Sequence, residues 1–364
     1  MEMNANNSPK KNLFSFQIDL SKFSAADFAP ATDEDKKQQD VMGESSTFLK
    51  DGMRRLMKNP LAVGSIVALL LIVVVILFAP LFIPYTYSGI ITVNGKRDKS
   101  ASNLAPFTYS KTEQAYMEKT GEQLFPHVMG TDKLGRDYFV RVIYGTRVSL
   151  SVGCVAAVMV LIIGCIYGSI AGYFGGKADL IMMRIVDIIY SLPDLLMIIL
   201  LSVVLQQTLA PAIEGTALAR LGSNMISMFV VFALLYWVGM ARLVRGQILT
   251  VKQNEYVLAA QCIGTKPGRI LRKHILPNCL SVIIISTALQ VPSAIFTESY
   301  LSFLGLGVSA PMPSLGSLAN DARTGLSSYP YLFIFPALVI CVIVLAFNLL
   351  GDGLRDAFDP KLQR

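Results

Sequence analysis

Two carboxylates lie inside stretches of the chain that are otherwise apolar. Asp194 follows Pro193 in the run SLPDLLMIIL, and Glu298 lies a few residues after Pro292, with Gln290 just before that proline. A carboxylate within a membrane-crossing segment is costly unless it faces protein or water. The prolines free backbone carbonyl groups and allow the helices to bend. Two interpretations stay open for these polar residues: a hydrated path through the bilayer, or buried hydrogen bonds between helices.

Chemistry that makes or breaks bonds has no visible site in this sequence. The phosphate-binding pattern G-x-x-x-x-G-K-[ST] is missing, because Gly176-Lys177 is followed by Ala178 and lacks the leading glycine. The cysteines suggest neither disulfides nor a metal site, since they lie in or beside apolar segments: Cys154, Cys165, Cys262, Cys279 and Cys341. We therefore expect no catalytic residue, no metal and no cofactor in this chain. Energy for any uphill movement would come from a partner or an ion gradient.

The apolar content of the chain indicates a membrane protein. Apolar residues make up 53% of its 364 residues and charged residues 16%, whereas charged residues make up about 25% of an average soluble domain. A transmembrane helix needs about 20 mostly apolar residues, and the first apolar segment, Leu61–Ile83, carries no charge. Five further apolar segments follow, at residues 148–174, 180–205, 225–248, 279–303 and 331–350. The predicted fold class is therefore an all-α membrane protein with six transmembrane helices.

The distribution of Lys and Arg predicts the orientation of these helices. Cytoplasmic links of membrane proteins carry an excess of basic residues, and this rule explains the net charge of +7 better than binding to nucleic acid does. Basic residues precede the first helix and occupy two links on the same side: Lys50, Arg54, Arg55, Lys58, Lys177, Arg242, Arg245, Lys252, Lys266, Arg269, Arg272 and Lys273. The short links on the opposite side hold only Arg220 and Arg323. Both termini are therefore predicted to be cytoplasmic.

The remaining segments complete the predicted organisation. Residues 1–58 form a polar tail that we expect to be cytoplasmic and largely disordered, with a short amphipathic piece around Leu13–Phe23. Residues 59–83 hold the first transmembrane helix. Residues 84–146 are expected to form an external subdomain around a small aromatic core: Tyr85, Tyr87, Phe107, Tyr109, Tyr116 and Phe125. Residues 147–350 then form a five-helix core, and residues 351–364 form a cytoplasmic C-terminal segment.

The long link between the fourth and fifth helices has the composition of a short helix, at residues 253–264. Glu255 to Cys262 suits a helix, and Gly264 is expected to stop it. Small side chains would let this helix lie in a groove of another protein, while its apolar residues make contact and its acid pairs with a basic rim. The residues expected to take part are Glu255, Tyr256, Val257, Leu258, Ala259, Ala260 and Gly264. An amphipathic helix that rests on the lipid surface is the alternative.

Several motifs of the chain resemble one family. The run Ala259-Ala260, followed by Gly264 and Leu276-Pro277, resembles the "EAA" loop of ABC importer permeases. Four other stretches are similar to the C-type permease subunit of oligopeptide and dipeptide importers: GTDKLGRD at 130–137, DLIMMRIVDIIYSLP at 179–193, ESYLSFLGLG at 298–307 and NLLGDGLRDAFDP at 348–360. Three residues depart from the family pattern, which has Glu, Ile and Trp in their place: Leu258, His274 and Leu315.

This resemblance implies a type I ABC importer permease fold in a bacterial plasma (inner) membrane, as a subunit of an ATP-driven peptide importer. The implied partners are a homologous B-type permease, two ATP-binding cassette ATPase subunits that hold ATP and Mg²⁺, and an extracytoplasmic peptide-binding protein. The helix at 253–264 would be the coupling helix that docks in a cleft of an ATPase subunit. Asp194, Gln290 and Glu298 would lie on or beside the path of the peptide.

Charged residues near the predicted helix ends also allow two interpretations. Asp132, Arg136 and Asp137 lie in a glycine-rich stretch that we expect to form a turn and a short helix at the outer surface. They would contact the binding protein or simply anchor the chain at the membrane interface. Arg184 and Asp187 lie about one helical turn apart in the third predicted segment, so we expect them to pair with each other.

Three other functions stay open at this stage. Within the family, the substrate could be nickel or a metal chelate instead of a peptide. A secondary peptide transporter would also have many transmembrane helices, but such proteins usually contain repeated halves and their own ion sites, and no repeat is visible here. A purely structural membrane subunit would need no coupling helix.

Overall fold

The computed structural model describes residues 48–364 apart from 217–218, 220, 309–311 and 359–364. Within this described part, six helical segments are long and apolar enough to cross a membrane, as the sequence predicted: Pro60–Phe82, Tyr138–Phe174, Asp194–Ile213, Ser223–Val251, Pro267–Phe303 and Tyr331–Phe358. The expected tail at 1–58 lies largely outside the described residues, as does its expected amphipathic piece. Its described end is the helix α2, Phe48–Leu56.

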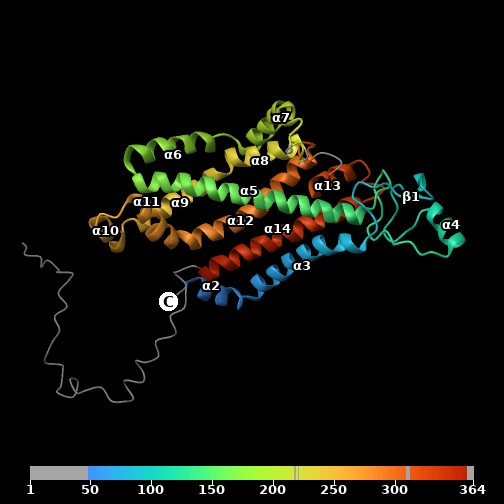
Figure 1. The fold of residues 1–364 in the computed structure, drawn as a ribbon, viewed down its shortest axis with the longest axis horizontal. Coiled ribbons are helices and arrows are strands. Elements are labelled where there is room, and N and C mark those ends of the chain that lie inside the picture. Colours follow the sequence, from blue (N-terminus) through green and yellow to red (C-terminus); the bar gives the residue numbers. More distant parts are fainter. Residues whose placement is uncertain (1–47, 217–218, 220, 309–311, 359–364) are drawn as a thin grey trace, which may run out of the picture. The chain divides into compact units, whose positions relative to one another are not determined.

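The other elements follow in chain order along Figure 1. They are α3 (Pro60–Phe82), β1 (Thr92–Val93), β2 (Lys96–Arg97), the 3₁₀ turn η3 (Lys99–Ala101), α4 (Lys111–Thr120), α5 (Tyr138–Phe174), α6 (Gly176–Tyr190), α7 (Asp194–Ile213), α8 (Ser223–Leu235), α9 (Trp237–Val251), α10 (Glu255–Cys262), α11 (Pro267–Ile270), the π-helical turn η5 (Leu271–Ile275), α12 (Leu276–Phe303), α13 (Leu315–Arg323) and α14 (Tyr331–Phe358).

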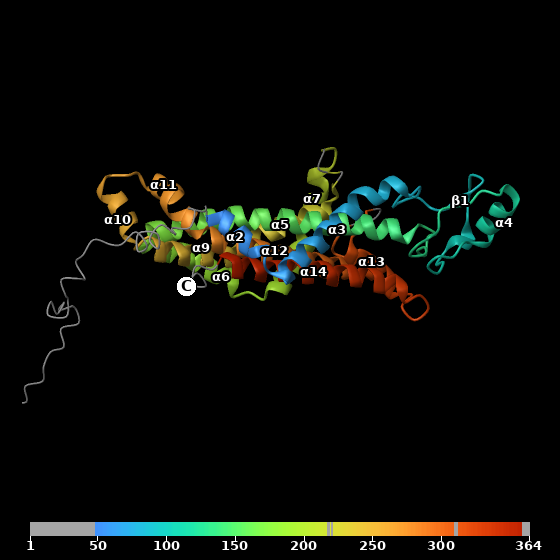
Figure 2. The ribbon, with the colours of Figure 1, turned by 90° about the horizontal axis from the view of Figure 1, so that it is seen from below.

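The long helix α5 is the centre of the bundle. It packs along α9 on one side and along α12 on another, while α14 packs between α12 and α3 (Figures 1 and 2). Glycines make the close approach possible, because an added Cβ at Gly168 would lie 2.4 Å from the carbonyl oxygen of Ala241 in α9. At Gly153 it would lie 2.5 Å from the side chain of Ile295 in α12. Small residues at helix contacts are how helices pack closely within a bilayer.

Two helix boundaries differ from the sequence prediction. The second membrane-crossing helix begins at Tyr138 instead of residue 148, because the Asp137 side chain caps it by accepting a hydrogen bond from the Val140 amide at 3.0 Å. The segment predicted at 180–205 is two helices, since α6 ends at Tyr190 and α7 begins at Asp194. Proline has no N–H to continue the helical hydrogen bonds, so the break falls at the residue preceding α7.

The predicted pair of Arg184 with Asp187 is wrong. Asp187 pairs instead with Arg242 of α9, with 2.6 Å between Nη2 and Oδ1, and the Arg242 guanidinium also lies over the ring of Tyr190. A partner on a neighbouring helix joins the two helices, which a pair within one helix cannot do. Sequence spacing showed only the partner within α6.

Residues 84–137, between α3 and α5, form a small folded segment that we call the insert. Its strands pair antiparallel, with Thr92 opposite Arg97, around a turn in which Asn94 and Gly95 both have positive φ. This Asn-Gly pair is the preferred sequence for a two-residue hairpin turn. Helix α4 begins with a capping box and ends at a left-handed glycine. Figure 1 shows the insert at one end of the bundle and α10 with α11 at the other.

The aromatic core expected for this segment is partly present. Tyr85, Tyr87 and Phe125 pack against buried residues at the end of α3 and the start of α5, so these rings attach the insert to the bundle. Tyr109 hydrogen-bonds through its hydroxyl to the Leu124 carbonyl. Phe107 is 67% exposed and is not part of a core.

Candidate functional site

Helix α10 lies within the segment 253–264, where the sequence predicted a helix. It runs from Glu255 to Cys262, and Gly264 stops it in a left-handed conformation with φ +77°. The Thr265 amide donates to the Ala260 carbonyl at 3.1 Å, and the Gly264 amide donates to the Gln261 carbonyl at 2.9 Å. This pair of hydrogen bonds is the Schellman motif, in which a glycine satisfies the last carbonyls of a helix.

One face of α10 is anchored in the protein. Val257 and Ala260 are buried and pack against Ile248 of α9 and against Ile270 and Ile275, which come from α11 and η5. Ala259, by contrast, is exposed. The two adjacent alanines therefore have different surroundings: one fixes the helix to the bundle, and the other is free to meet a partner. The sequence alone did not separate them.

The other face of α10 is exposed and apolar. Tyr256 and Leu258 are each nearly half exposed, and Glu255 and Gly264 also lie at the surface. Ile263, which the sequence prediction missed, is 82% exposed and is the most exposed large apolar residue of the described part. The sequence signal that could have identified it is an apolar residue directly before Gly264, the glycine that ends the helix.

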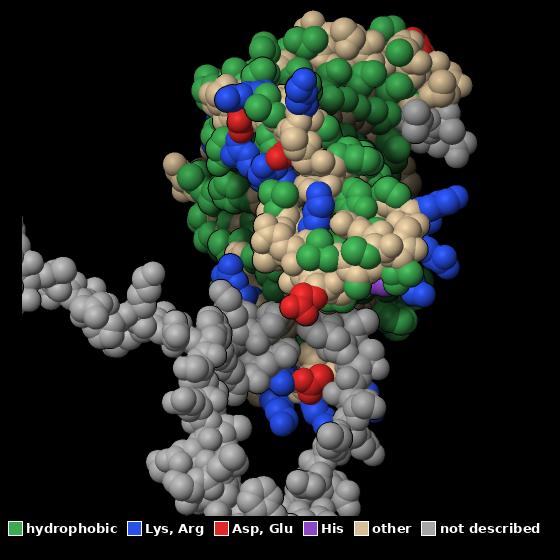
Figure 3. Space-filling model, turned by 90° about the vertical axis from the view of Figure 1, so that its left-hand side faces the viewer, with side chains coloured by type: hydrophobic (Ala, Val, Ile, Leu, Met, Phe, Trp, Pro, Cys, Tyr) green, Lys and Arg blue, Asp and Glu red, His purple; other side chains and the backbone are tan. Residues whose placement is uncertain are grey.

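Basic residues also lie at this end of the bundle. Figure 3 looks onto this end of the molecule and shows Lys and Arg side chains scattered among hydrophobic and other side chains, with a few Asp and Glu. Those of the link after α10 are exposed: Lys266, Arg269, Arg272 and Lys273. The end of the bundle thus offers an apolar ridge with a positively charged border.

Ion pairs connect α9, the helix that leads into α10, with α6. Arg245 and Asp179 form a two-bond pair in which Nη2 lies 2.6 Å from Oδ2. Asp187 and Arg242 form the second pair, described above. Lys252, just after α9, donates to the Tyr173 carbonyl near the end of α5 at 2.5 Å. These contacts fix the end of α9 to both neighbouring helices.

The three polar residues predicted for a path lie at different places. Asp194 is the first residue of α7 and is exposed. Gln290 lies half-buried in the middle of α12. Glu298, further along α12, is fully buried. All three are described, and no hydrogen bond joins any two of them.

Glu298 is the centre of a buried polar cluster. Its carboxylate accepts hydrogen bonds from Ser149 of α5 at 2.6 Å and from Ser302 of α12 at 2.7 Å. Ser149 also accepts the Leu315 amide at the start of α13, and Ser314, which caps α13, donates to Ser302. For Glu298 the structure therefore shows buried hydrogen bonds between helices. Leu315 itself is fully buried in the core, so this departure from the family pattern serves packing.

The predicted external interface residues are buried inside the insert. Asp132 is 5%, Arg136 8% and Asp137 2% exposed. Asp132 accepts from Arg136 Nε at 2.7 Å and also contacts Arg141. Burial raises the pKa of Asp132, but the Arg136 hydrogen bonds and the Arg141 charge outweigh it and hold this pKa below its usual range. The fold can bury these charged side chains because acids and bases pair with one another.

The short helix expected in the 130–137 stretch is not present. These residues form turns and two isolated β-bridges, Ile90 with Arg136 and Thr131 with Asp137. Gly130 and Gly135 both have positive φ, a conformation that glycine adopts without strain. An added Cβ at Gly130 would also lie 2.1 Å from the Leu104 carbonyl oxygen.

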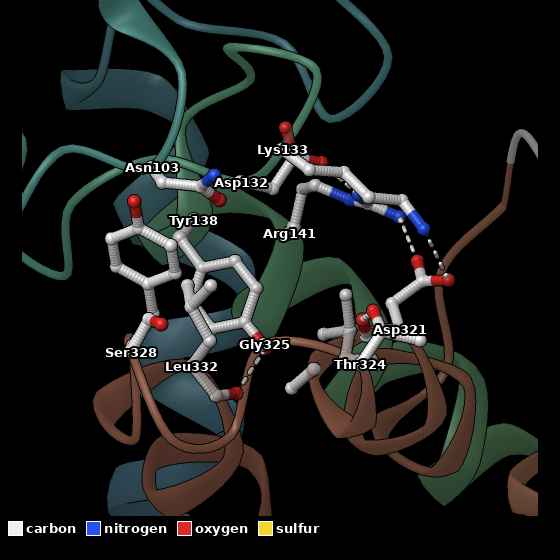
Figure 4. Close-up of a pocket in the computed structure, with 13 residues that line it drawn as sticks. Asn103, Asp132, Lys133, Tyr138, Arg141, Asp321, Thr324, Gly325, Ser328 and Leu332 are labelled. Atoms are coloured by element: carbon white, nitrogen blue, oxygen red, sulfur yellow. Dashed lines mark hydrogen bonds and ion pairs between the residues drawn. The ribbon is translucent and has the colours of Figure 1, made fainter.

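A cavity of about 290 Å³ lies where the insert meets the rest of the bundle (Figure 4). Its wall includes Lys133 of the insert, Arg141 of α5 and Asp321 of α13. Asp321 lies 3.7 Å from Lys133 Nζ and 3.8 Å from an Arg141 nitrogen. The sequence prediction missed this cavity, because its lining residues come from three distant parts of the chain and form no local motif.

His127 forms a buried ion triad within the insert, and the sequence prediction missed it as well. Its Nδ1 lies 2.8 Å from Asp137 Oδ2, and its Nε2 lies 3.1 Å from Glu113 Oε1. Burial lowers the pKa of His127, but the two carboxylates outweigh it and raise this pKa to about 9. The ring is therefore a cation that joins the start of α4 to the start of α5.

Comparison with known proteins decides the family. A family model described as "binding-protein-dependent transport system inner membrane component" matches residues 164–364. A second, the N-terminal transmembrane domain of oligopeptide transport permease C, matches residues 47–116. The chain belongs to the binding-protein-dependent transport system inner membrane component family. It is accordingly a multi-pass protein of the bacterial inner membrane with the ABC importer permease fold, as the resemblance implied.

Curated relatives match most of the chain. An oligopeptide transport system permease protein of Bacillus subtilis is 41% identical over 337 residues, which cover 93% of this chain and 97% of the relative. A dipeptide transport system permease protein of the same organism is 41% identical over 333 residues, covering 91% and 92%. An oligopeptide transport system permease protein of Escherichia coli is 38% identical over 318 residues, covering 87% and 93%. These names give no support to a metal-chelate substrate or to a secondary transporter.

Proposed function

We propose that this chain is the transmembrane permease subunit of an ATP-driven importer of oligopeptides or dipeptides. Relatives named for these two substrates match the chain over nearly its whole length. The chain forms half of the translocation path, and a homologous B-type permease forms the other half. An extracytoplasmic binding protein delivers the peptide at the end that carries the insert.

Helix α10 is the observation that carries this proposal. It projects at one end of the bundle (Figure 2), and its exposed apolar residues Tyr256, Leu258 and Ile263 have no reason to face water in an isolated protein. Two ATPase subunits bind below the permease pair, and one of them receives this ridge. The basic border favours an acidic rim on that subunit.

The buried face of α10 explains how a movement of the ATPase reaches the membrane. Val257 and Ala260 are held in the same cluster of buried residues as Ile248 of α9. Cores of this kind are close-packed, so α10 and α9 move together instead of sliding past each other. The ion pairs from α9 to α6 extend the movement to the helix before Asp194. ATP and Mg²⁺ belong to the ATPase subunits, and this chain has no bond chemistry of its own.

Orientation follows from charge. The α10 end carries the clustered Lys and Arg residues, so it faces the cytoplasm together with both termini. The insert then faces outward. Asp194 and Gln290, which have exposed surface in this chain, line the path or border it, and Glu298 holds α5, α12 and α13 together beside it.

A pair of alanine variants tests the proposal. The assay uses the assembled complex reconstituted in vesicles. Ala259→Arg places a charge in the docking face and is expected to reduce peptide uptake at least about tenfold. The reason is that an unpaired charge in a packed interface costs more than about 1.4 kcal/mol of binding free energy. ATP hydrolysis then no longer depends on added binding protein. Ala178, at the start of α6, is also exposed, so Ala178→Arg is the matched control and is expected to leave uptake unchanged.

The neighbouring alanine, Ala260, is not suitable for this test, because it is buried and Ala260→Arg would disturb the fold of α10 itself. Two results would contradict the proposal. If the Ala259→Arg complex takes up peptide at the normal rate, α10 is not the docking element. If the wild-type complex copurifies with no ATPase, the importer proposal fails as a whole.

A further inference from the structure

The insert has nearly balanced charge in its sequence but not on its surface. Residues 84–137 contain seven Lys and Arg residues: Lys96, Arg97, Lys99, Lys111, Lys119, Lys133 and Arg136. They contain six Asp and Glu residues: Asp98, Glu113, Glu118, Glu122, Asp132 and Asp137. A count of charges along the chain therefore predicts a nearly neutral segment.

Folding separates these charges by sign. Four of the six acids are buried, at 5% exposure or less, and only Glu118 and Glu122 are exposed. Six of the seven bases are exposed, and only Arg136 is buried. The surface of the insert therefore carries six positive side chains against two negative ones.

Three of the four buried acids are paired with buried cations, whereas Asp98 is held by hydroxyl groups and keeps its negative charge. Asp98 accepts hydrogen bonds from Ser100 and Thr112, and it also contacts Ser110. The other three are held by Arg136, Arg141 and His127, as described above. Every buried acid thus has a structural partner, and the six exposed bases still outnumber the two exposed acids and Asp98 taken together.

The β-hairpin concentrates part of this charge around a hollow. Lys96, Arg97 and Lys99 line an open depression of about 790 Å³, with Asp98 and Thr112 in its wall. We call these three bases the basic face. Lys96 and Lys99 form no ion pair with any described residue, and Arg97 donates to the Leu134 carbonyl at 3.3 Å. The hydrogen bonds of Asp98 and the tight hairpin turn fix the backbone that carries the basic face.

The position of the basic face selects its partner. Figures 1 and 2 show β1 and α4 beyond the ends of α3 and α5, at the extreme of the bundle opposite α10. A lipid headgroup would meet residues at the margin of the membrane-crossing helices, whereas the hairpin projects away from them. A soluble protein that approaches from outside meets the hairpin first.

We propose that the basic face docks a complementary acidic surface of the peptide-loaded binding protein. This inference rests on the proposed function, which supplies a binding protein as the partner. It replaces Asp132, Arg136 and Asp137, which are buried, with Lys96, Arg97 and Lys99 as the contact residues. Exposed charges of this kind act mainly on the rate of association, which salt screens.

The test measures association of the binding protein with the whole importer. The complex is placed in nanodiscs of neutral lipid, and the peptide-loaded binding protein that copurifies with it is the probe. We expect the double substitution Lys96→Glu with Lys99→Glu to lower the association rate about tenfold or more at low salt, with little change in the dissociation rate. The difference should largely disappear near 1 M salt, where the Debye length is about 3 Å.

A substitution of opposite sign is the matched control. Glu118 is exposed on α4 and has no hydrogen bond or ion pair with any described residue, so Glu118→Lys adds positive charge without breaking a contact. It should raise the association rate, which no loss of structure would do. Amide exchange of α4 that matches the wild type would show that the Lys96 and Lys99 variant is folded.

Three results would overturn the inference. The first is an unchanged association rate in the Lys96 and Lys99 variant at low salt. The second is a Lys96 and Lys99 variant that binds the binding protein normally and loses only its binding to vesicles of anionic phosphatidylglycerol. This result would assign the basic face to lipid. The third is a wild-type complex that binds no binding protein at all, which would also overturn the proposed function; the first two results leave that function intact.

Discussion

The triad around His127 predicts that the insert loosens in alkaline solution. Both ring nitrogens lie within hydrogen-bond distance of a carboxylate, so both must carry a proton, and the ring is cationic. The other groups that face it are the rings of Tyr85, 4.9 Å away between centroids, and Tyr109 at 6.3 Å. When the ring loses its proton, one carboxylate loses its donor and the cation between two acids disappears.

The magnitude follows from the pKa of His127. A rise from 6.5 to about 9 corresponds to about 3 kcal/mol of preference for the protonated ring in the folded insert. Because this pKa is raised on folding, the stabilisation is complete below pH 6.5 and is lost as the pH rises through about 9. It amounts to roughly 2.5 kcal/mol at pH 7 and to almost nothing at about pH 10.

Amide hydrogen exchange of α4 measures this loss. After correction for the intrinsic effect of pH on exchange, protection of α4 should fall roughly seventyfold between about pH 7 and pH 10. His127→Gln cannot donate to both carboxylates, so it should lower protection already at pH 7 and abolish the pH dependence. Exchange in the core of α12 serves as the internal reference. A wild-type profile that is flat over this range, or the same slope in His127→Gln, would refute the argument.

Three pairs of substitutions test contacts in the bundle. Glu298→Gln keeps most of the buried hydrogen bonds and should lower the free energy of unfolding by about 1 kcal/mol or less. Glu298→Ala leaves serine hydroxyls without partners and should lower it by about 3 kcal/mol. Thermal unfolding in detergent measures both changes. Gly168→Ala should destabilise the folded protein by more than about 2 kcal/mol, because the added Cβ would meet the backbone of Ala241. Gly246→Ala is its control: the added Cβ would have nothing within 4 Å, so this change should be neutral or slightly stabilising. Arg242→Ala should lower the melting temperature and Arg184→Ala should not; equal effects would contradict the assigned ion pair.

The sequence predicted the membrane helices and α10 because their signals are local. The length of an apolar segment alone indicates a transmembrane helix. Gly264 ends α10 because it adopts the left-handed backbone conformation. The break before Asp194 was also local, since Pro193 was visible, but an apolar stretch on both sides concealed it. Length and composition report burial in lipid, and they do not report where a helix is interrupted.

The contacts of charged residues could not be read in the same way. Asp187 has a candidate partner at one turn within α6, but its partner in the fold is Arg242, more than fifty positions away in the chain. The acids of the 130–137 stretch were predicted to be exposed, because charged residues usually are. Their burial depends on Arg141 and His127, and nothing in the spacing of the sequence brings these residues together.

Two helix interruptions adjoin in the folded chain, and this arrangement favours one place for bending. The α6–α7 break ends at Asp194, and Tyr236 separates α8 from α9. Helix α7 packs against α8, and the hydroxyl of Tyr236 lies 2.5 Å from the hydroxyl of Thr297 in α12. Bending a helix where its hydrogen bonds are already interrupted costs less than bending it within a continuous segment. If α10 moves with an ATPase subunit as proposed above, we expect α9 and its ion pairs to α6 to carry the movement to this junction of three helices. The close glycine contacts of α5 with α9 and α12 would then make α5 the less deformable neighbour.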